Sequence, residues 1–147
     1  MSIAPGYCTL KSKKVFIYID GGARGNPGPA GIGVVMLDSG KKKLKEIYKY
    51  IGEATNNIAE YSALVCALEE AASFGAEDIV LHMDSELVAK QLSGEYRVKN
   101  EDIKTLFDKA LGLLKIFNSF EVKRIDRSKN KEADKLVNKA INLASLF

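Results

Sequence analysis

The chain has little of what stabilises small secreted or metal-bound domains: it contains two cysteines, a single histidine and no tryptophan among 147 residues. Cys8 and Cys66 are too few and too far apart for a disulfide framework or a zinc site, so we expect two free thiols in a reducing, cytoplasmic setting. No apolar run approaches the ~20 residues of a membrane span, and residues 1–12 lack the apolar segment of a signal peptide. We therefore expect no association with membranes.

What the chain does contain is typical of one folded domain. Its hydrophobic content of 46% excludes disorder, and a chain of this length buries a core without disulfides or a structural metal. The net charge of +3 permits an anionic partner but does not indicate one. Residues 1–13 show no periodicity and predict a flexible N-terminal arm, whereas residues 14–147 predict the domain. We expect this domain to be monomeric.

The order of the predicted strands and helices indicates an α/β fold. Three strand-like segments come first, and their short connections predict an antiparallel meander over residues 15–19, 32–37 and 44–51. Two further strands are expected over residues 78–83 and 120–125. The periodicity predicts helices over residues 56–74, 85–91, 101–117 and 129–143. This order predicts a mixed five-stranded sheet, with three antiparallel and two parallel strands, flanked by helices.

Four acidic residues stand where such a fold places a ligand. Asp20 and Asp84 end two predicted strands, and Glu60 and Asp134 lie in the first turns of two predicted helices. Since strand ends and helix starts meet at one edge of the sheet, the four side chains can converge there. Each acid alone is also explained as a helix cap, a turn former or a partner of a helix dipole. Four carboxylates with no basic residue among them require cations, which indicates hard divalent metal ions.

Two polar segments accompany these acids. The glycine-rich residues 20–29 can cradle a phosphate with backbone amides, but they lack the ending of a P-loop, and a tight hairpin connection explains them equally well. Thr55, Asn56 and Asn57 stand at a helix start that suits an anion, although plain N-capping accounts for one of the three. We interpret the single histidine, His82, as a packed strand residue.

Four sequence blocks, taken in order, resemble ribonuclease H of type 1: YIDGGARGNPGPAGIGVV, EATNNIAEYSALVCALE, MDSELV and KNKEADKLVNKA. The resemblance runs from about Lys14 to the C-terminus and implies a ribonuclease H-like fold. It also implies a metal-dependent endonuclease that hydrolyses the RNA strand of RNA/DNA hybrids and leaves 5′-phosphate and 3′-hydroxyl ends. In that family two Mg²⁺ or Mn²⁺ ions are bound by an acidic set that falls here on Asp20, Glu60, Asp84 and Asp134. The family's substrate contacts fall on Asn26, Thr55, Asn56, Asn57 and Ser85.

The chain departs from the family in the loop before the last acid. Many bacterial members carry a histidine there, whereas residues 125–130 contain none, so Arg127 is the nearest candidate for its catalytic part. A solvated cation, or an ion pair with Asp126 or Glu132, explains Arg127 equally well. The long basic handle of some members is also absent. Two alternative functions stay open: a nuclease of the same fold that also cleaves double-stranded RNA, and an inactive hybrid-binding module.

Overall fold

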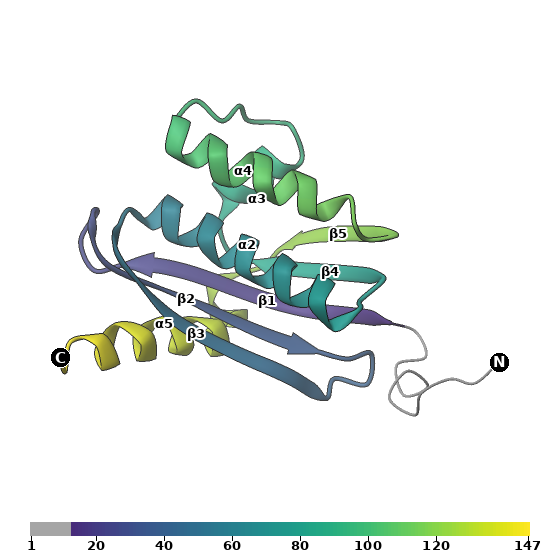
Figure 1. Cartoon of the computed structure of the whole chain (residues 1–147), viewed down its shortest axis with the longest axis horizontal. Helices are drawn as coiled ribbons and strands as arrows, with labels where there is room; N and C mark the ends of the chain where they lie inside the picture. The colour runs from purple at the N-terminus through teal and green to yellow at the C-terminus, as the bar shows by residue number, and fades with distance from the viewer. Residues whose placement is uncertain (1–12) are drawn as a thin grey trace.

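The computed structural model describes residues 13–147, which form a five-stranded sheet with helices on both faces (Figure 1). The strand order is β3-β2-β1-β4-β5, in which β1 to β3 pair antiparallel and β4 and β5 join parallel to β1. The predicted mixed sheet is thereby confirmed. The elements are, in chain order, β1 (Lys14–Ala23), β2 (Gly28–Leu37), β3 (Lys43–Ala54), α2 (Asn56–Phe74), β4 (Asp78–Met83), α3 (Glu86–Leu92), α4 (Glu101–Leu114), β5 (Ser119–Arg124), the 3₁₀ helix η1 (Arg127–Lys129) and α5 (Lys131–Ala144).

The two faces of the sheet carry different helices. Helices α2, α3 and α4 lie on one face, and α5 lies on the other (Figure 1). On the first face, the fully buried side chains of Ile17 on β1 and Leu81 on β4 belong to one core with Leu64 of α2. On the second face, α5 packs across β2 and β3, and Gly33 of β2 lets the α5 backbone approach closely. The carboxyl ends of β1 and β4 therefore lie between α2 and α5.

Helix α2 has the bounds that the sequence predicts, because both of its ends are chemically marked. The Thr55 hydroxyl accepts a hydrogen bond of 3.2 Å from the backbone N–H of Ile58, which caps the first turn. Gly75 adopts a left-handed φ of 86° and ends the helix, a conformation that glycine enters without a Cβ penalty. This helix carries Glu60 to the carboxyl end of β1.

The first two strands are longer than predicted. The sequence predicts that the first strand ends at Asp20, but β1 continues to Ala23 and β2 begins at Gly28, so the turn is only residues 24–27. Glycines usually indicate a loop, yet here Gly21 lies within the ladder opposite Ile32. It is required for close packing against α2 rather than for a turn.

Two predicted helix bounds are also wrong. Helix α4 ends at Leu114 rather than at residue 117, because the next residues turn so that the N–H of Asn118 can donate to the carbonyl of Glu77 beside β4. The closing helix begins at Lys131 rather than at residue 129. The separate 3₁₀ turn η1 precedes it, and Asn130, with φ −118° and ψ 30°, interrupts the helical backbone between them.

His82 is a packed strand residue, as predicted. Only 8% of it is exposed, its Nδ1 lies 3.1 Å from the carbonyl oxygen of Ile17, and its ring stacks on Tyr18 at 4.1 Å between centroids. Burial lowers the pKa of this imidazole. The histidine therefore has a structural role.

Some predictions concern residues 1–12, which lie outside the described residues. Of the predicted arm, only Lys13 is described, and Cys8 is not. Cys66 on α2 is a free thiol, half-buried, with its pKa raised by burial. None of the described helices is both long and apolar enough to cross a bilayer.

Candidate active site

The four predicted acids gather at the carboxyl ends of the two central strands. Asp20 lies on β1, Asp84 directly follows β4, Glu60 lies in the second turn of α2, and Asp134 lies in the first turn of α5. All four are half-buried. Asp20, Glu60 and Asp84 line one narrow crevice, and Asp20 and Asp134 line a cavity of about 170 Å³ that also includes Arg127. Four separate elements thus deliver four carboxylates to one place.

The negative charge on this cluster is only partly compensated, by the exposed Arg127 beside Asp134. Burial, with repulsion from Asp84, Asp134 and Glu60, raises the pKa of Asp20 to about 8. Burial also raises the pKa of Glu60 to about 7, although a hydrogen bond from Ser85 opposes the shift. Two carboxyl groups that resist ionisation near neutral pH show how strongly the site favours added positive charge.

The donor set fits hard divalent cations. Carboxylate oxygens are the ligands that Mg²⁺ and Mn²⁺ prefer, and Mg²⁺ keeps several waters while it binds only one or two carboxylates. Within residues 13–147, no three or more His, Cys, Asp or Glu side chains lie so that they could hold one metal ion between them. The acids line an open crevice instead, which suits ions that must also contact substrate.

The pKa values predict an unusual pH dependence of stability without metal. Asp20 and Glu60 have ordinary values of 3.8 and 4.5, so between about pH 4 and about pH 8 the folded state binds more protons than the unfolded state. The contribution of these two carboxyl groups to the free energy of unfolding is therefore most favourable at low pH, and it falls as the pH rises through this window. In EDTA, we expect a melting temperature at least ~5 °C higher at about pH 5 than at about pH 8.5. Differential scanning calorimetry measures this difference.

Asp20→Asn is the matched control for this pH dependence, because it removes the group with the most strongly raised pKa. The variant should show a smaller fall in melting temperature over the same pH window. Addition of about 10 mM Mg²⁺ should raise the wild-type melting temperature at the higher pH. A wild-type stability that rises steadily from pH 5 to pH 8.5 in EDTA contradicts the assignment of repulsive burial to these acids.

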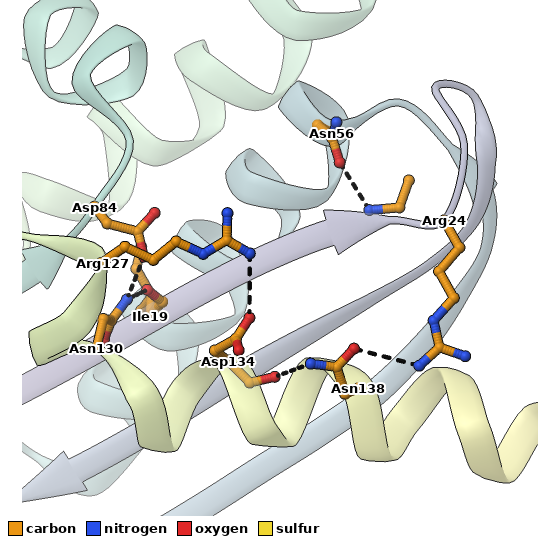
Figure 2. Close-up of polar contacts among 9 residues, drawn as sticks. Ile19, Arg24, Asn56, Asp84, Arg127, Asn130, Asp134 and Asn138 are labelled. Carbon is orange, nitrogen blue, oxygen red and sulfur yellow. Dashed lines mark hydrogen bonds and ion pairs between the residues drawn. The ribbon is translucent and has the colours of Figure 1, made fainter.

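The turn between β1 and β2 is tied to the start of α2 by amide side chains. The Asn26 Oδ1 accepts a 3.0 Å hydrogen bond from the N–H of Asn56. The Asn56 Oδ1 in turn accepts one of 2.8 Å from the N–H of Ala23, and Figure 2 shows this bond from the Asn56 side chain. Thr55 caps the helix beside them. Because both amide oxygens are used internally, the NH₂ groups are the parts left to face a ligand.

The other two predicted substrate contacts differ from each other. The Asn57 side chain is half-buried and makes no hydrogen bond to any described residue, so both ends of its amide can contact a ligand. The Ser85 hydroxyl accepts a 3.2 Å hydrogen bond from the N–H of Val88, which caps α3, and also bonds to Glu60. Ser85 therefore has a clear structural role in the site.

Arg127 lies at the edge of the acidic cluster. Its Nη2 is 3.6 Å from Oδ1 of Asp134 (Figure 2), and 80% of its side chain is exposed. The partner is therefore a member of the cluster rather than Asp126 or Glu132, the two partners considered from the sequence. The positive charge of the guanidinium also opposes the rise in the pKa of Glu60 that burial causes, so Arg127 acts on a second acid of the cluster.

Two asparagines of the last sequence block were not predicted as site residues. Asn130 is 1% exposed and contacts Asp84, and Asn138 links two groups on α5 and the β1–β2 turn (Figure 2). The Asn138 Oδ1 accepts from Arg24 at 3.2 Å, and its Nδ2 donates to the carbonyl of Asp134 at 3.1 Å. An asparagine next to a predicted helix start resembles an ordinary cap, so the sequence carried no signal of burial.

A mixed sheet with three antiparallel and two parallel strands, with acids at the ends of its two central strands, is the arrangement of ribonuclease H-like nucleases. The family model described as "Reverse transcriptase-like" matches residues 18–140. The chain is 43% identical over 129 residues to ribonuclease HI of Halobacterium salinarum. The aligned segment covers 88% of this chain and 65% of that protein. It is 41% identical over 133 residues to the bifunctional protein Rv2228c of Mycobacterium tuberculosis, covering 90% and 36%.

Solved structures agree with these sequence matches. The crystal structure of RNase H1 from Halobacterium salinarum superimposes with a TM-score of 0.85 and covers 88% of this chain and 98% of that one. LC11-RNase H1 in complex with an RNA/DNA hybrid superimposes with a TM-score of 0.84 at 46% identity, covering 88% and 98%. The chain belongs to the ribonuclease H type 1 family, a family of endoribonucleases. It spans between about a third and two thirds of the length of the two relatives named above.

Proposed function

We propose that this chain is a divalent-metal-dependent endonuclease that hydrolyses the RNA strand of RNA/DNA hybrids and leaves 5′-phosphate and 3′-hydroxyl ends. The observation that carries the proposal is the convergence of four carboxylates from β1, α2, β4 and α5 beside the polar start of α2. The hybrid bound to the related LC11-RNase H1 supports the choice of substrate.

The proposed cofactor is a pair of Mg²⁺ or Mn²⁺ ions. The residues that would hold them are Asp20, Glu60, Asp84 and Asp134. When bound, such ions supply an activated water and charge stabilisation for the departing 3′ oxygen. The carboxylates have their own part in this chemistry, because their burial at the ends of rigid elements fixes where cations and phosphate oxygens meet.

The start of α2 supplies the proposed selectivity for RNA. The 2′-hydroxyl is the only sugar group that distinguishes RNA from DNA, and it both donates and accepts hydrogen bonds. The free amide of Asn57 can satisfy both functions, and Asn56 offers an NH₂ donor next to it. Asn26 and Thr55 hold this surface in place, and the helix N-terminus attracts a phosphate.

A cleavage assay with matched substrates tests this proposal. The RNA strand of one sequence is labelled and presented in an RNA/DNA hybrid, in double-stranded RNA and alone, with Mg²⁺, with Mn²⁺ and with EDTA. We expect metal-dependent internal cleavage of the hybrid only. Equal cleavage of double-stranded RNA supports the broader nuclease instead, and hybrid binding without hydrolysis in either metal supports an inactive binding module.

Arg127 is proposed to contact the scissile phosphate or the departing 5′-phosphate. Its fork of donors suits phosphate oxygens, and its position beside Asp134 places it at the cluster edge. Arg127→Ala should lower turnover by about 10- to 100-fold, which corresponds to roughly 1.4 to 2.7 kcal/mol. The melting temperature should change little, since an exposed ion pair contributes about 0–1 kcal/mol. Single-turnover and steady-state rates measure the effect.

Lys129→Ala is the matched control for Arg127, because it removes an exposed positive charge from the same 3₁₀ turn. We expect Lys129→Ala to cleave hybrid at nearly the wild-type rate, and Arg127→Lys to restore the rate only in part. Equal rates for wild type and Arg127→Ala under both kinetic regimes make Arg127 a solvated loop cation.

The monomeric state and cytoplasmic location remain proposals from the sequence.

A further inference from the structure

Asn130 stands at the junction of the elements that carry three of the four acids. It follows η1, precedes α5 and is 1% exposed, although asparagine is usually a surface residue. Its backbone carbonyl accepts a 3.1 Å hydrogen bond from the N–H of Asp134 in the first turn of α5. Its side chain points away from α5 toward β1 and the end of β4 (Figure 2).

The Asn130 side chain bridges two strand ends. Its Nδ2 donates 2.8 Å to the carbonyl of Ile19, the residue before Asp20, and 3.0 Å to Oδ2 of Asp84. Both partners are acceptors, so only an NH₂ group with two hydrogens satisfies them together. The amide orientation is therefore fixed by its partners, and an aspartate of the same shape would place a carboxylate against two acceptors.

The other end of the same amide has no partner. Asn130 Oδ1 is buried and accepts no hydrogen bond from any described residue. A buried acceptor without a partner costs stability, so a residue selected for stability alone would not leave one. What the arrangement provides is a fixed donor to Asp84, whose second carboxylate oxygen has no hydrogen-bond partner among the described residues.

We propose that Asn130 is a positioning residue that holds the Asp84 carboxylate through one oxygen and leaves the other for a divalent metal ion. Through Ile19 the same amide ties this carboxylate to the strand end that bears Asp20. Outer groups that orient metal ligands typically change metal affinity or activity by about 10- to 100-fold when they are replaced. This inference rests on the proposed function, because it assigns Asp84 to the metal site.

The test compares Asn130→Ala, which removes the donor without adding charge, with Asn142→Ala, which makes the same change at an exposed position of α5. Mn²⁺ binding to each protein is measured by titration calorimetry without nucleic acid, and kcat and KM are measured with hybrid. For Asn130→Ala we expect at least ~10-fold weaker Mn²⁺ binding and a ~10- to 100-fold lower kcat, with KM within about threefold of wild type. Asn142→Ala should match wild type in all three.

A second variant keeps the test decisive if Asn130→Ala does not fold. Asn130→Ser retains one donor, is assayed in the same way, and should weaken Mn²⁺ binding less than alanine does. In an Asp84→Asn background, Asn130→Ser should cause no further loss of Mn²⁺ affinity, because the carboxylate it orients is gone. A full additional loss there overturns the proposal, as does a folded Asn130 variant with lowered melting temperature but wild-type Mn²⁺ affinity and kcat.

These outcomes are distinct from failure of the proposed function. If Asp84→Asn itself retains wild-type hydrolysis and Mn²⁺ binding, then Asp84 is not a metal ligand and the proposed site is wrong. If Asp84→Asn lowers both the rate of hydrolysis and the Mn²⁺ affinity while the Asn130 variants keep both, the site stands and only the role of Asn130 is overturned.

Discussion

Asp20→Asn is expected to lower hydrolysis of RNA/DNA hybrid by at least ~10³-fold, a loss of about 4 kcal/mol of transition-state stabilisation. Of the four acids, Asp20 is the one that lines both the crevice and the adjoining cavity, and its pKa is raised by burial and by the charges of the other three. The same substitution should raise the melting temperature in EDTA, because it removes one charge from a buried, mutually repelling set. Single-turnover cleavage and calorimetry together measure these opposite effects.

This prediction is specific because activity is expected to fall while the melting temperature rises. A residue that served only the fold would lose stability and activity together when it was replaced. Asp108→Asn is a suitable control, because it removes an exposed carboxylate whose only ion pair within residues 13–147 is with Lys104 on α4. The control should hydrolyse hybrid at the wild-type rate and change stability by no more than about 1 kcal/mol. Near-wild-type turnover of Asp20→Asn removes this residue from the catalytic role.

The loss of activity on replacing each of the other acids is expected to depend on how its carboxylate is placed in the site. Asp84→Asn and Glu60→Gln should resemble Asp20→Asn, since both residues line the same crevice. Asp134 has 35% of its side chain exposed and is paired with Arg127, so Asp134→Asn should cost less activity. A larger loss for Asp134→Asn than for Asp20→Asn contradicts this order.

The sequence predicted the sheet and the acidic cluster because both depend on local patterns. Apolar runs end at Asp20 and Asp84, and helical periodicity begins just before Glu60 and Asp134, so the carboxyl edge of the sheet could be recognised without coordinates. The resemblance to ribonuclease H added the proposed substrate and the proposed metal ions. Neither source indicated how the polar side chains share their hydrogen bonds.

What could not be predicted depends on contacts between segments distant in sequence. Asn130 and Asp84 are 46 positions apart, and nothing local to either residue signals that one donates to the other. Ser85 similarly serves a helix cap and Glu60 at once. The sequence predicts a loop for the glycines after Asp20, because composition shows flexibility but not the close approach of another backbone.

Gly21→Ala tests that close approach and is expected to have a large effect on both stability and activity. A Cβ at this position would lie 2.2 Å from the carbonyl oxygen of Ala59 and 2.6 Å from the backbone nitrogen of Glu60. Both contacts are with the backbone of α2, which cannot rotate away as a side chain does. Accommodation requires β1 and α2 to separate, and overpacking of this kind costs about 1–3 kcal/mol or more.

This separation should also reduce activity, because the contact lies between the residue after Asp20 and the helix residue Glu60 itself. A displacement of about 1 Å between catalytic groups can cost ~10²-fold in rate, so we expect a kcat loss of that order together with a melting temperature lowered by roughly 3–10 °C. Gly112→Ala on α4 is the matched control, since its Cβ would meet nothing within 4 Å. In that exposed helical position alanine should stabilise by up to ~1 kcal/mol and leave the rate unchanged. If Gly21→Ala retains wild-type kcat and stability, the spacing between β1 and α2 does not set the geometry of the acids, and their placement must be fixed by α5 and the end of β4 instead.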